Sequence, residues 1–292
     1  MLDNLNVLIL GGDTRYVEVI DAFADKGASV YVAGYDHLAL SSSIHKTSVK
    51  NVNFSKMDAI ILPVAGTDTS GNIEATFSDE IFMLTEELLA QTPKHCTIYT
   101  GTANSYLEKL AQTTNRKLVK LFARDDIAIM NSIPTAEATL KIAIEETDET
   151  IHRSNVTVLG FGRVGITVAR LFGVVGANVY VAARKPADIA RITEMGLKAV
   201  SFNEIDKIIG KMDITINTVP HHVLDAKRIA TMKKNSLIID LASKPGGTDF
   251  SAAKQEGVHA IHALGLPGKT AAKTAGKIIA NVLTDVISTS KT

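Results

Sequence analysis

The most constraining feature of the sequence is a ten-residue run, 156–165, that reads VTVLGFGRVG. Its first four residues are apolar or β-branched and predict a buried strand. Three glycines in the pattern G-x-G-x-x-G follow at once and open a stretch of helical period. Such glycines let the backbone turn tightly, approach a pyrophosphate closely and present helix N-terminal amides to its charge. The run therefore predicts a dinucleotide-binding turn formed by Gly160, Phe161, Gly162, Arg163, Val164 and Gly165.

The same alternation of a short β-branched run, a glycine-rich turn and a helical stretch recurs along most of the chain, as in parallel βαβ units. In the second half, strands are predicted at residues 156–159, 179–182, 198–200, 214–217, 237–241 and 259–261. In the first half, strands are predicted at 6–10, 29–33, 59–62, 96–99 and 118–121, with helices at 15–25, 79–91 and 104–112. The fold class is therefore α/β, with two doubly wound parallel sheets, flavodoxin-like in the N-terminal domain and Rossmann-type in the C-terminal domain.

The length of 292 residues agrees with two domains, since a domain usually takes roughly 100–200 residues. We predict an N-terminal domain that holds the substrate over residues 1–133 and a dinucleotide-binding domain over 151–269. Between them, residues 134–150 predict a linking helix with Pro134 in its first turn. Apolar residues at helical spacing over 270–292 predict a C-terminal helix that packs back at the domain junction.

Charge and cysteine content exclude several classes of function. Lys plus Arg equals Asp plus Glu at 31 each, so the chain has no net field that would draw it to nucleic acid or to an acidic membrane. The single cysteine, Cys96, rules out an internal disulfide, and the histidine pairs lack carboxylate or thiol companions at ligand spacing. No metal site is therefore predicted. The acidic N-terminus and the short apolar runs predict a cytoplasmic protein without a membrane partner.

The residues after the second strand of the C-terminal domain bear on the choice of cofactor. A dinucleotide-binding domain usually carries an acidic residue about 20 residues after the glycines, which accepts a hydrogen bond from the ribose 2′-hydroxyl. Residues 180–185 instead read YVAARK, without a carboxylate. Arg184 and Lys185 would favour a 2′-phosphate, so NADP is the predicted cofactor. If this basic pair is only a solvated turn, NAD remains possible.

Two later loops follow predicted strands at the carboxyl edge of the same sheet, where ligands of open α/β folds bind. Residues 217–222 read NTVPHH and are expected to border the nicotinamide. Residues 240–249 read DLASKPGGTD, and their glycines allow a close approach of backbone to ligand. The residues predicted to contact the cofactor in these loops are Thr218, Val219, Pro220, Leu241 and Ala242.

The N-terminal domain also opens with a glycine turn, LGGDTR at residues 10–15, which lacks a third glycine at the helix-packing position. An anion such as a substrate carboxylate, held by Arg15 and the amides of this helix start, is a better match than a second dinucleotide. Residues 100–105, TGTANS, and Arg124 follow later strands and mark the rim of the same cleft. For any single polar residue of residues 100–105, helix capping is the simpler interpretation.

Four segments together resemble one family: residues 11–15 (GGDTR), 131–137 (NSIPTAE), 160–165 (GFGRVG) and 265–269 (GLPGK). Many dehydrogenases share the glycine pattern, but the combination over the whole chain resembles the dipicolinate synthase A-subunit family of spore-forming bacteria. The resemblance implies an NAD(P)-dependent oxidoreductase that forms pyridine-2,6-dicarboxylate from dihydrodipicolinate or its hydrated precursor, a lysine-pathway compound. It also implies a role in sporulation, a location in the mother cell and a flavoprotein-like partner, the dipicolinate synthase B subunit.

Loop position selects the residues expected to act on a small dicarboxylate. Such a substrate needs cationic partners for its two carboxylates, alignment with the nicotinamide and a proton acceptor. The predicted carboxylate partners are Arg15, Arg124, Lys269 and, as a weaker fourth, Lys244. His262, at the end of the last predicted strand, is the predicted acid/base residue.

Two other functions remain open at this point. A D-2-hydroxyacid dehydrogenase has a similar two-domain design, but that family typically carries an Arg after the fifth strand of the nucleotide domain, where this chain has Ser243 and Lys244. A non-enzymatic NADP sensor would bind the cofactor without turnover and signal through a change in domain angle. A homo-oligomer is plausible from the general prevalence of symmetric assemblies.

Overall fold

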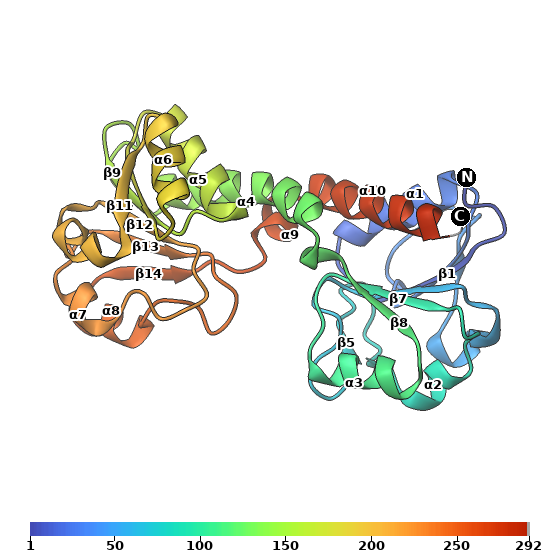
Figure 1. Cartoon of the computed structure of the whole chain (residues 1–292). Helices are drawn as coiled ribbons and strands as arrows, with labels where there is room; N and C mark the ends of the chain where they lie inside the picture. Colours follow the sequence, from blue (N-terminus) through green and yellow to red (C-terminus); the bar gives the residue numbers. More distant parts are fainter. Residues whose placement is uncertain (291–292) are drawn as a thin grey trace. The chain divides into compact units, whose positions relative to one another are not determined.

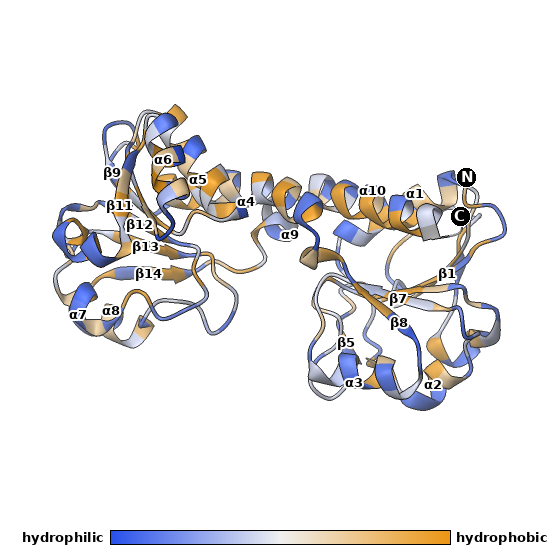
Figure 2. Cartoon of the chain, in the orientation of Figure 1, coloured by the Kyte–Doolittle hydropathy of each residue, from blue (hydrophilic) through white to orange (hydrophobic). Residues whose placement is uncertain are grey.

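The computed structural model describes residues 1–290 and divides the chain into two compact units (Figure 1). One unit comprises residues 1–128 together with the C-terminal segment from residue 271, and the other comprises residues 129–270. Each unit is built on a six-stranded parallel sheet, which confirms the predicted class of two α/β domains. Figure 2 shows apolar residues concentrated in the strands and on helices such as α10.

The N-terminal sheet has the strand order β3-β2-β1-β4-β7-β8. Its strands are β1 (Asn6–Leu10), β2 (Ser29–Ala33), β3 (His45–Lys46), β4 (Ala59–Ile61), β7 (Thr97–Thr100) and β8 (Lys117–Lys120). The five predicted strands are all present, and without the two-residue edge strand β3 their order is the flavodoxin-like 2-1-3-4-5. The central strand β1 is buried from Val7 to Leu10 because it has a neighbour on each side and helices on both faces.

The helices of this unit include one from each end of the chain. They are α1 (Arg15–Asp25), α2 (Glu86–Ala90), α3 (Ser105–Thr113) and α10 (Ala272–Ser290). Helix α10 belongs to the N-terminal unit and packs along α1 (Figure 1). Ile279 and Leu283 of α10 share one apolar core with Phe23 of α1. The Lys26 ammonium donates a hydrogen bond to Thr284 Oγ1 at 2.7 Å.

The helix predicted over residues 79–91 is wrong in its first half. Residues 72–83 contain a small antiparallel pair, β5 (Asn72–Ile73) and β6 (Phe82–Met83), and α2 starts only at Glu86. Phe82 is buried by pairing with Ile73, not on a helix face. The Thr85 hydroxyl accepts from Leu88 N at 3.4 Å and so marks the true helix start.

The linking helix also differs from the prediction. Helix α4 (Asp125–Glu145) starts nine residues before Pro134, which lies in its interior, and ends before residue 150. An interior proline removes one main-chain donor and bends a helix. The hydroxyls of Ser132 and Thr135 donate to main-chain carbonyls one turn earlier, at 2.6 and 2.9 Å. These hydroxyls bond the carbonyls of Ile129 and Asn131, which flank the Met130 carbonyl that Pro134, lacking an N–H, cannot bond.

The C-terminal sheet has the order β11-β10-β9-β12-β13-β14, all parallel. Its strands are β9 (Asn155–Leu159), β10 (Asn178–Ala183), β11 (Lys198–Ser201), β12 (Ile214–Asn217), β13 (Leu237–Asp240) and β14 (His259–His262). Its helices, besides α4, are α5 (Arg163–Val174), α6 (Pro186–Glu194), α7 (Ala226–Ala230), α8 (Phe250–Glu256) and α9 (Leu266–Thr270). The chain changes direction across the sheet between β9 and β12, which is where ligands of such sheets bind. Within residues 1–290, no helix is long and apolar enough to cross a membrane.

The contact between α10 and α1 leaves no room for a side chain at Gly276. A Cβ there would collide with the Arg15 carbonyl oxygen and lie 3.0 Å from Glu18 Cβ. We expect Gly276→Ala to lower the free energy of unfolding of the N-terminal unit by about 1–3 kcal/mol, measured by chemical denaturation. The matched control is Gly173→Ala in α5, whose Cβ would meet only the flexible Leu197 side chain at 3.1 Å. Equal effects of the two substitutions would contradict this account.

Candidate functional site

The turn from β9 to α5 gives each of its three glycines a different task. Gly160 has φ +103°, in the left-handed region that favours glycine, and its amide donates to the Ala182 carbonyl at 3.0 Å. A Cβ on Gly165 would collide with the Gly160 carbonyl oxygen, so α5 packs on the end of β9 only through a glycine. A Cβ on Gly162 would meet no heavy atom within 4 Å. The fold requires the first and third glycines, while the second faces open space.

That open space fits the pyrophosphate of a dinucleotide. Gly162 is exposed and is the N-cap of α5, a helix of 12 residues, so main-chain amides of the first turn lie beside it. Phe161 and Val164 pack against the apolar core of the unit, whereas Arg163 is exposed. Phe161 and Val164 thus fix the turn to the core, while its exposed side at Gly162 is accessible to an anion.

The basic pair lies one strand away from this turn. Arg184 and Lys185 directly follow β10, which pairs with β9, and both side chains are exposed. The Arg184 guanidinium lies over the Phe202 ring, 5.2 Å from its centroid, and this cation–π contact orients it. The end of β10 therefore presents positive charge where other dinucleotide-binding domains present a carboxylate.

A row of register partners crosses the carboxyl edge of the sheet. Leu159 of β9 pairs with Asn217 of β12, Asn217 pairs with Asp240 of β13, and Asp240 pairs with His262 of β14. Asn217 and Asp240 are both fully buried. Three polar side chains at the ends of adjacent strands thus lie next to one another, at the edge that carries the glycine turn.

Asp240 is the centre of this row. Its Oδ1 accepts from Asn217 Nδ2 and from the Ala242 amide, both at 2.9 Å. Its Oδ2 accepts from the Gly247 amide and the Thr248 hydroxyl, both at 2.8 Å. The carboxylate therefore fixes the loop after β13 and ties it to β12. Sequence reasoning missed this role, although an aspartate at the end of an apolar strand was a usable signal.

The loop after β12 joins this network to the glycine turn. The Thr218 hydroxyl donates to the Leu159 carbonyl at 2.8 Å, and a Cβ on Gly160 would lie 2.5 Å from Thr218 Oγ1. Asn217 Oδ1 accepts from the Val219 amide at 3.1 Å, and Pro220 is exposed at the loop tip. The predicted cofactor residues after β9, β10, β12 and β13 are thus brought to one edge of one sheet.

The structure gives His262 a supporting contact. Its ring stacks on Phe250 with centroids 5.2 Å apart, and its Nε2 lies 2.9 Å from the Ala242 carbonyl oxygen. A carbonyl oxygen only accepts, so Nε2 donates and carries the proton in this arrangement. His262 therefore helps to hold the loop after β13, and its predicted acid/base role would fall to Nδ1.

The four basic residues predicted to bind carboxylates differ in their surroundings. Arg15 forms a two-point ion pair with Asp13, at 2.9 Å from Nε and 2.6 Å from Nη2. Burial would raise the pKa of Asp13, but the hydrogen bonds and charge of Arg15 bring it below its ordinary value. Arg124 pairs in the same way with Asp126, at 3.1 and 2.7 Å. Both pairs join residues two positions apart, a spacing visible in the sequence.

Within residues 1–290, the two lysines form no such ion pair. Lys244 follows β13 and Lys269 lies in α9, and both are exposed. Among the ion pairs of the described residues, neither lysine is matched with a carboxylate. Their charges are therefore available to a ligand, whereas each arginine presents its fork to the chain's own carboxylate.

The loop after β7 follows the capping interpretation. Asn104 Oδ1 accepts from Leu107 N at 2.9 Å and caps α3, while its Nδ2 donates to the Thr67 carbonyl. Thr102 instead donates its hydroxyl proton to the Val64 carbonyl at 3.2 Å. These side chains hold neighbouring loops together at the carboxyl edge of the N-terminal sheet.

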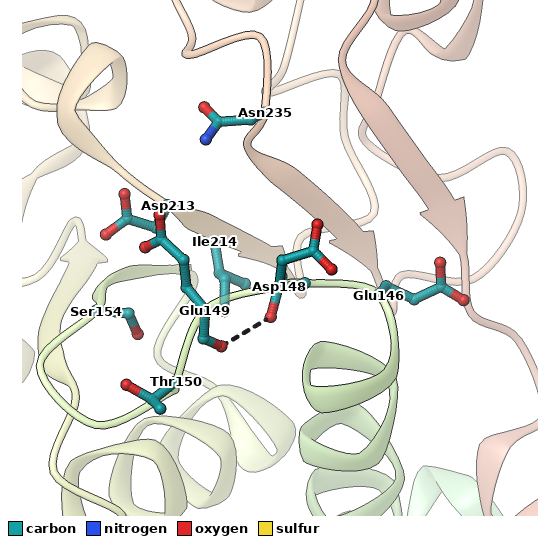
Figure 3. Close-up of a pocket in the computed structure, with 9 residues that line it drawn as sticks. Glu146, Asp148, Glu149, Thr150, Ser154, Asp213, Ile214 and Asn235 are labelled. Atoms are coloured by element: carbon teal, nitrogen blue, oxygen red, sulfur yellow. Dashed lines mark hydrogen bonds between the residues drawn. The ribbon is translucent and has the colours of Figure 1, made fainter.

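A separate pocket lies at the amino ends of β9 and β12 (Figure 3). Residues that line it include Glu146, Asp148, Glu149, Ser154 and Asp213. Its acidic lining would repel both a pyrophosphate and a dicarboxylate, and it lies at the edge of the sheet opposite to the glycine turn. Among residues 1–290, no group of three or more His, Cys, Asp or Glu is placed to hold a metal ion.

Strand order, glycine turn and edge loops together define the C-terminal unit as a nicotinamide-dinucleotide-binding domain. Residues 127–244 match the family model described as "D-isomer specific 2-hydroxyacid dehydrogenase, NAD binding domain". Residues 6–122 match the family model for the N-terminal domain of the dipicolinate synthase A subunit. Over 289 residues the chain is 46% identical to the dipicolinate synthase A subunit of Bacillus subtilis (strain 168), covering 98% of this chain and 97% of that protein. The chain belongs to the dipicolinate synthase A-subunit family.

Two solved structures agree with this assignment. The dipicolinate synthase A subunit from Bacillus halodurans is 45% identical, with a TM-score of 0.97 and 98% of each chain covered. The A chain of dipicolinate synthase from Bacillus subtilis is 46% identical, with a TM-score of 0.94 over 99% of this chain and 97% of that chain. The resemblance inferred from four short segments is thus confirmed over the full length.

The different tasks of Gly162 and Gly165 can be separated by substitution. Gly162→Val would fill the open space and should abolish binding of both NADPH and NADH, measured by fluorescence titration, while the melting temperature stays near that of the parent protein. Gly165→Val should lower the free energy of unfolding by about 2 kcal/mol or more, because its side chain collides with the Gly160 carbonyl. Retained cofactor affinity in Gly162→Val would place the cofactor elsewhere.

Proposed function

We propose that this chain is the cofactor-binding oxidoreductase subunit of a dipicolinate synthase, which forms pyridine-2,6-dicarboxylate from dihydrodipicolinate or its hydrated precursor. Full-length membership of the family, with an open cradle at Gly162, is the observation that carries the proposal. The nicotinamide, when bound, supplies the acceptor for a hydride. The protein's own task is then to hold two carboxylates, align the ring and accept a proton, since oxidation of the dihydropyridine gains aromaticity.

Within the C-terminal unit, Lys244 is our first choice for a substrate carboxylate. It follows Ala242 in the loop that Asp240 fixes, and its exposed ammonium has no carboxylate partner among the described residues. Lys269 is the second choice, because its ammonium is also exposed and has no carboxylate partner among the described residues. Arg15 and Arg124 would each have to leave an aspartate before they could bind substrate with the same fork. His262 would accept the proton at Nδ1, since Nε2 is engaged with a carbonyl.

NADP is the cofactor that we propose in preference to NAD. The exposed pair Arg184 and Lys185 at the end of β10 supports this choice, because guanidinium and ammonium groups bind a 2′-phosphate by charge-assisted hydrogen bonds. The contact of Arg184 with Phe202 supports it further, since it limits the conformations of the guanidinium.

Arg184→Asp tests this preference. A charge-assisted hydrogen bond contributes about 1.5–3 kcal/mol, so NADP(H) affinity should fall by about tenfold or more, while NAD(H) affinity changes little. Isothermal titration calorimetry with all four cofactors measures both effects. Arg191→Asp, an exposed position on α6 whose arginine pairs with Glu194, is the matched control and should change neither affinity. Equal losses of NADP and NAD affinity in Arg184→Asp would refute the 2′-phosphate role.

The relatives are named as the A subunit of a synthase, which supports a second subunit in the active assembly. We propose that this partner is the flavoprotein-like B subunit of dipicolinate synthase, and that the location is the cytoplasm of the mother cell of a sporulating bacterium. A chain that needs a partner could bind cofactor without turnover when assayed alone. The experiment on activity must therefore include the partner.

The deciding measurement follows the absorbance of the aromatic pyridine dicarboxylate. Freshly generated dihydrodipicolinate is mixed with NADP or NAD and this chain, with and without the second subunit. Product that depends on both the chain and an oxidised cofactor is the expected result. A parallel arm with 2-hydroxy acids tests the dehydrogenase alternative, which the match of residues 127–244 favours over other enzyme classes. Cofactor binding without product in any arm would overturn the synthase and support a sensor.

A further inference from the structure

The buried carboxylate of Asp240 is surrounded by hydrogen-bond donors. The amides of Ala242 and Gly247 can only donate. The orientation of Asn217 is set by the Val219 amide, which donates to Asn217 Oδ1, so the NH₂ group faces Asp240. Both oxygens of Asp240 therefore act as acceptors, which is the behaviour of an ionised carboxylate.

No cation neutralises this charge through an ion pair within the described part of the chain. His262 is a titratable group close to this carboxylate, since a Cβ on Gly246 would lie 3.1 Å from Asp240 Oδ2 and 3.3 Å from His262 Nε2. That nitrogen is engaged with the Ala242 carbonyl. Burying a charge without a counter-ion is unfavourable, and four hydrogen bonds offset the cost here. The fold thus keeps a fixed negative charge at 0% exposure.

The position of the Asp240 charge determines which part of a bound cofactor it would act on. Asp240 is linked by hydrogen bonds to Asn217, whose neighbour Thr218 contacts the end of β9 and the glycine turn. The loops after β12 and β13 are those expected to border the nicotinamide in a sheet of this order. A fixed charge beneath these two loops therefore acts on the nicotinamide half of the site and not on the adenine half.

We propose that Asp240 determines which redox state of the cofactor the site prefers, by favouring the positively charged oxidised nicotinamide over the neutral reduced ring. This inference rests on the proposed function, because it takes the carboxyl edge as the nicotinamide site. A charge held in a water-excluded environment attracts a nearby cation more strongly than in bulk water, and it offers no such attraction to an uncharged ring. The same preference favours release of the reduced cofactor after hydride transfer, and it makes the bound oxidised ring a weaker hydride acceptor.

Direct binding measures this preference without turnover. Dissociation constants of NADP⁺, NADPH, NAD⁺ and NADH are determined by calorimetry for the parent protein and for Asp240→Asn. The ratio of the reduced to the oxidised dissociation constant reports the preference. We expect the parent to bind the oxidised form at least as tightly as the reduced form, and Asp240→Asn to lower the ratio by about tenfold, equivalent to about 1.4 kcal/mol.

Thr248→Val is the matched control, because it removes one donor from the same carboxylate and keeps the charge. Its ratio should equal that of the parent. If both substitutions shift the ratio equally, the effect comes from a disturbed loop and the proposal is wrong. If Asp240→Asn does not fold, the ratio measured for the parent protein is the test. Tenfold tighter binding of the reduced form by the parent would overturn the proposal, and tighter binding of the oxidised form would support it.

The measurement also separates this inference from the function on which it rests. A parent protein that binds none of the four cofactors refutes the proposed function, and this inference with it. A parent protein that binds them, with a ratio that Asp240→Asn leaves unchanged, refutes the charge effect alone and leaves the proposed function standing.

Discussion

The approach of α5 to the end of β9 is the contact on which the C-terminal unit depends. Gly165 lies so close to the Gly160 carbonyl that no side chain fits between them. This approach brings the amides at the start of α5 to the carboxyl edge of the sheet, with the exposed Gly162 in front of them. Gly160 in turn contacts Thr218, so the same turn sets where the loop after β12 lies. The contact between Gly165 and Gly160 thus sets the position of both the pyrophosphate site at Gly162 and the loop after β12.

Much of the fold could be predicted because its signals are local. Strands such as β9 are β-branched runs that end at glycines. A short run of this kind is typical of a strand buried on both faces of a parallel sheet. The errors occurred where a local signal had two meanings. Pro134 is typical of a helix start, yet helix α4 runs through it, with the hydroxyls of Ser132 and Thr135 bonded to neighbouring main-chain carbonyls. Phe82 falls within the helix predicted over 79–91, yet it lies in strand β6 and is buried opposite Ile73.

The site could be predicted only in part, for the same reason. The glycine turn and the basic pair are contiguous in the sequence, and strand order alone places them side by side. The Asp240 network required tertiary structure, because Asn217 is 23 positions away and the complete burial of the carboxylate has no counterpart in the sequence pattern. The pairing of Arg15 with Asp13 could be predicted in part. The sequence shows that the two residues are two positions apart, but it does not show that Asp13 occupies both Nε and Nη2 of the guanidinium.

The two six-stranded sheets have the same strand order, yet the open cradle for a pyrophosphate is found in the C-terminal unit, and the difference lies in what covers the first turn. In the N-terminal unit, the Gly12 amide donates to the Glu74 carbonyl at 2.8 Å, and a Cβ on Gly11 would collide with that same oxygen. The segment after β5 therefore covers the turn at Gly11 and Gly12, and Asp13, which pairs with Arg15, stands at the position that corresponds to Gly162. A pyrophosphate needs open space and main-chain amides that have no partner within the protein. The turn at Gly162 has the open space, whereas the Gly12 amide is already bonded to the Glu74 carbonyl, so the same architecture yields a dinucleotide turn in the C-terminal unit and not at Gly12.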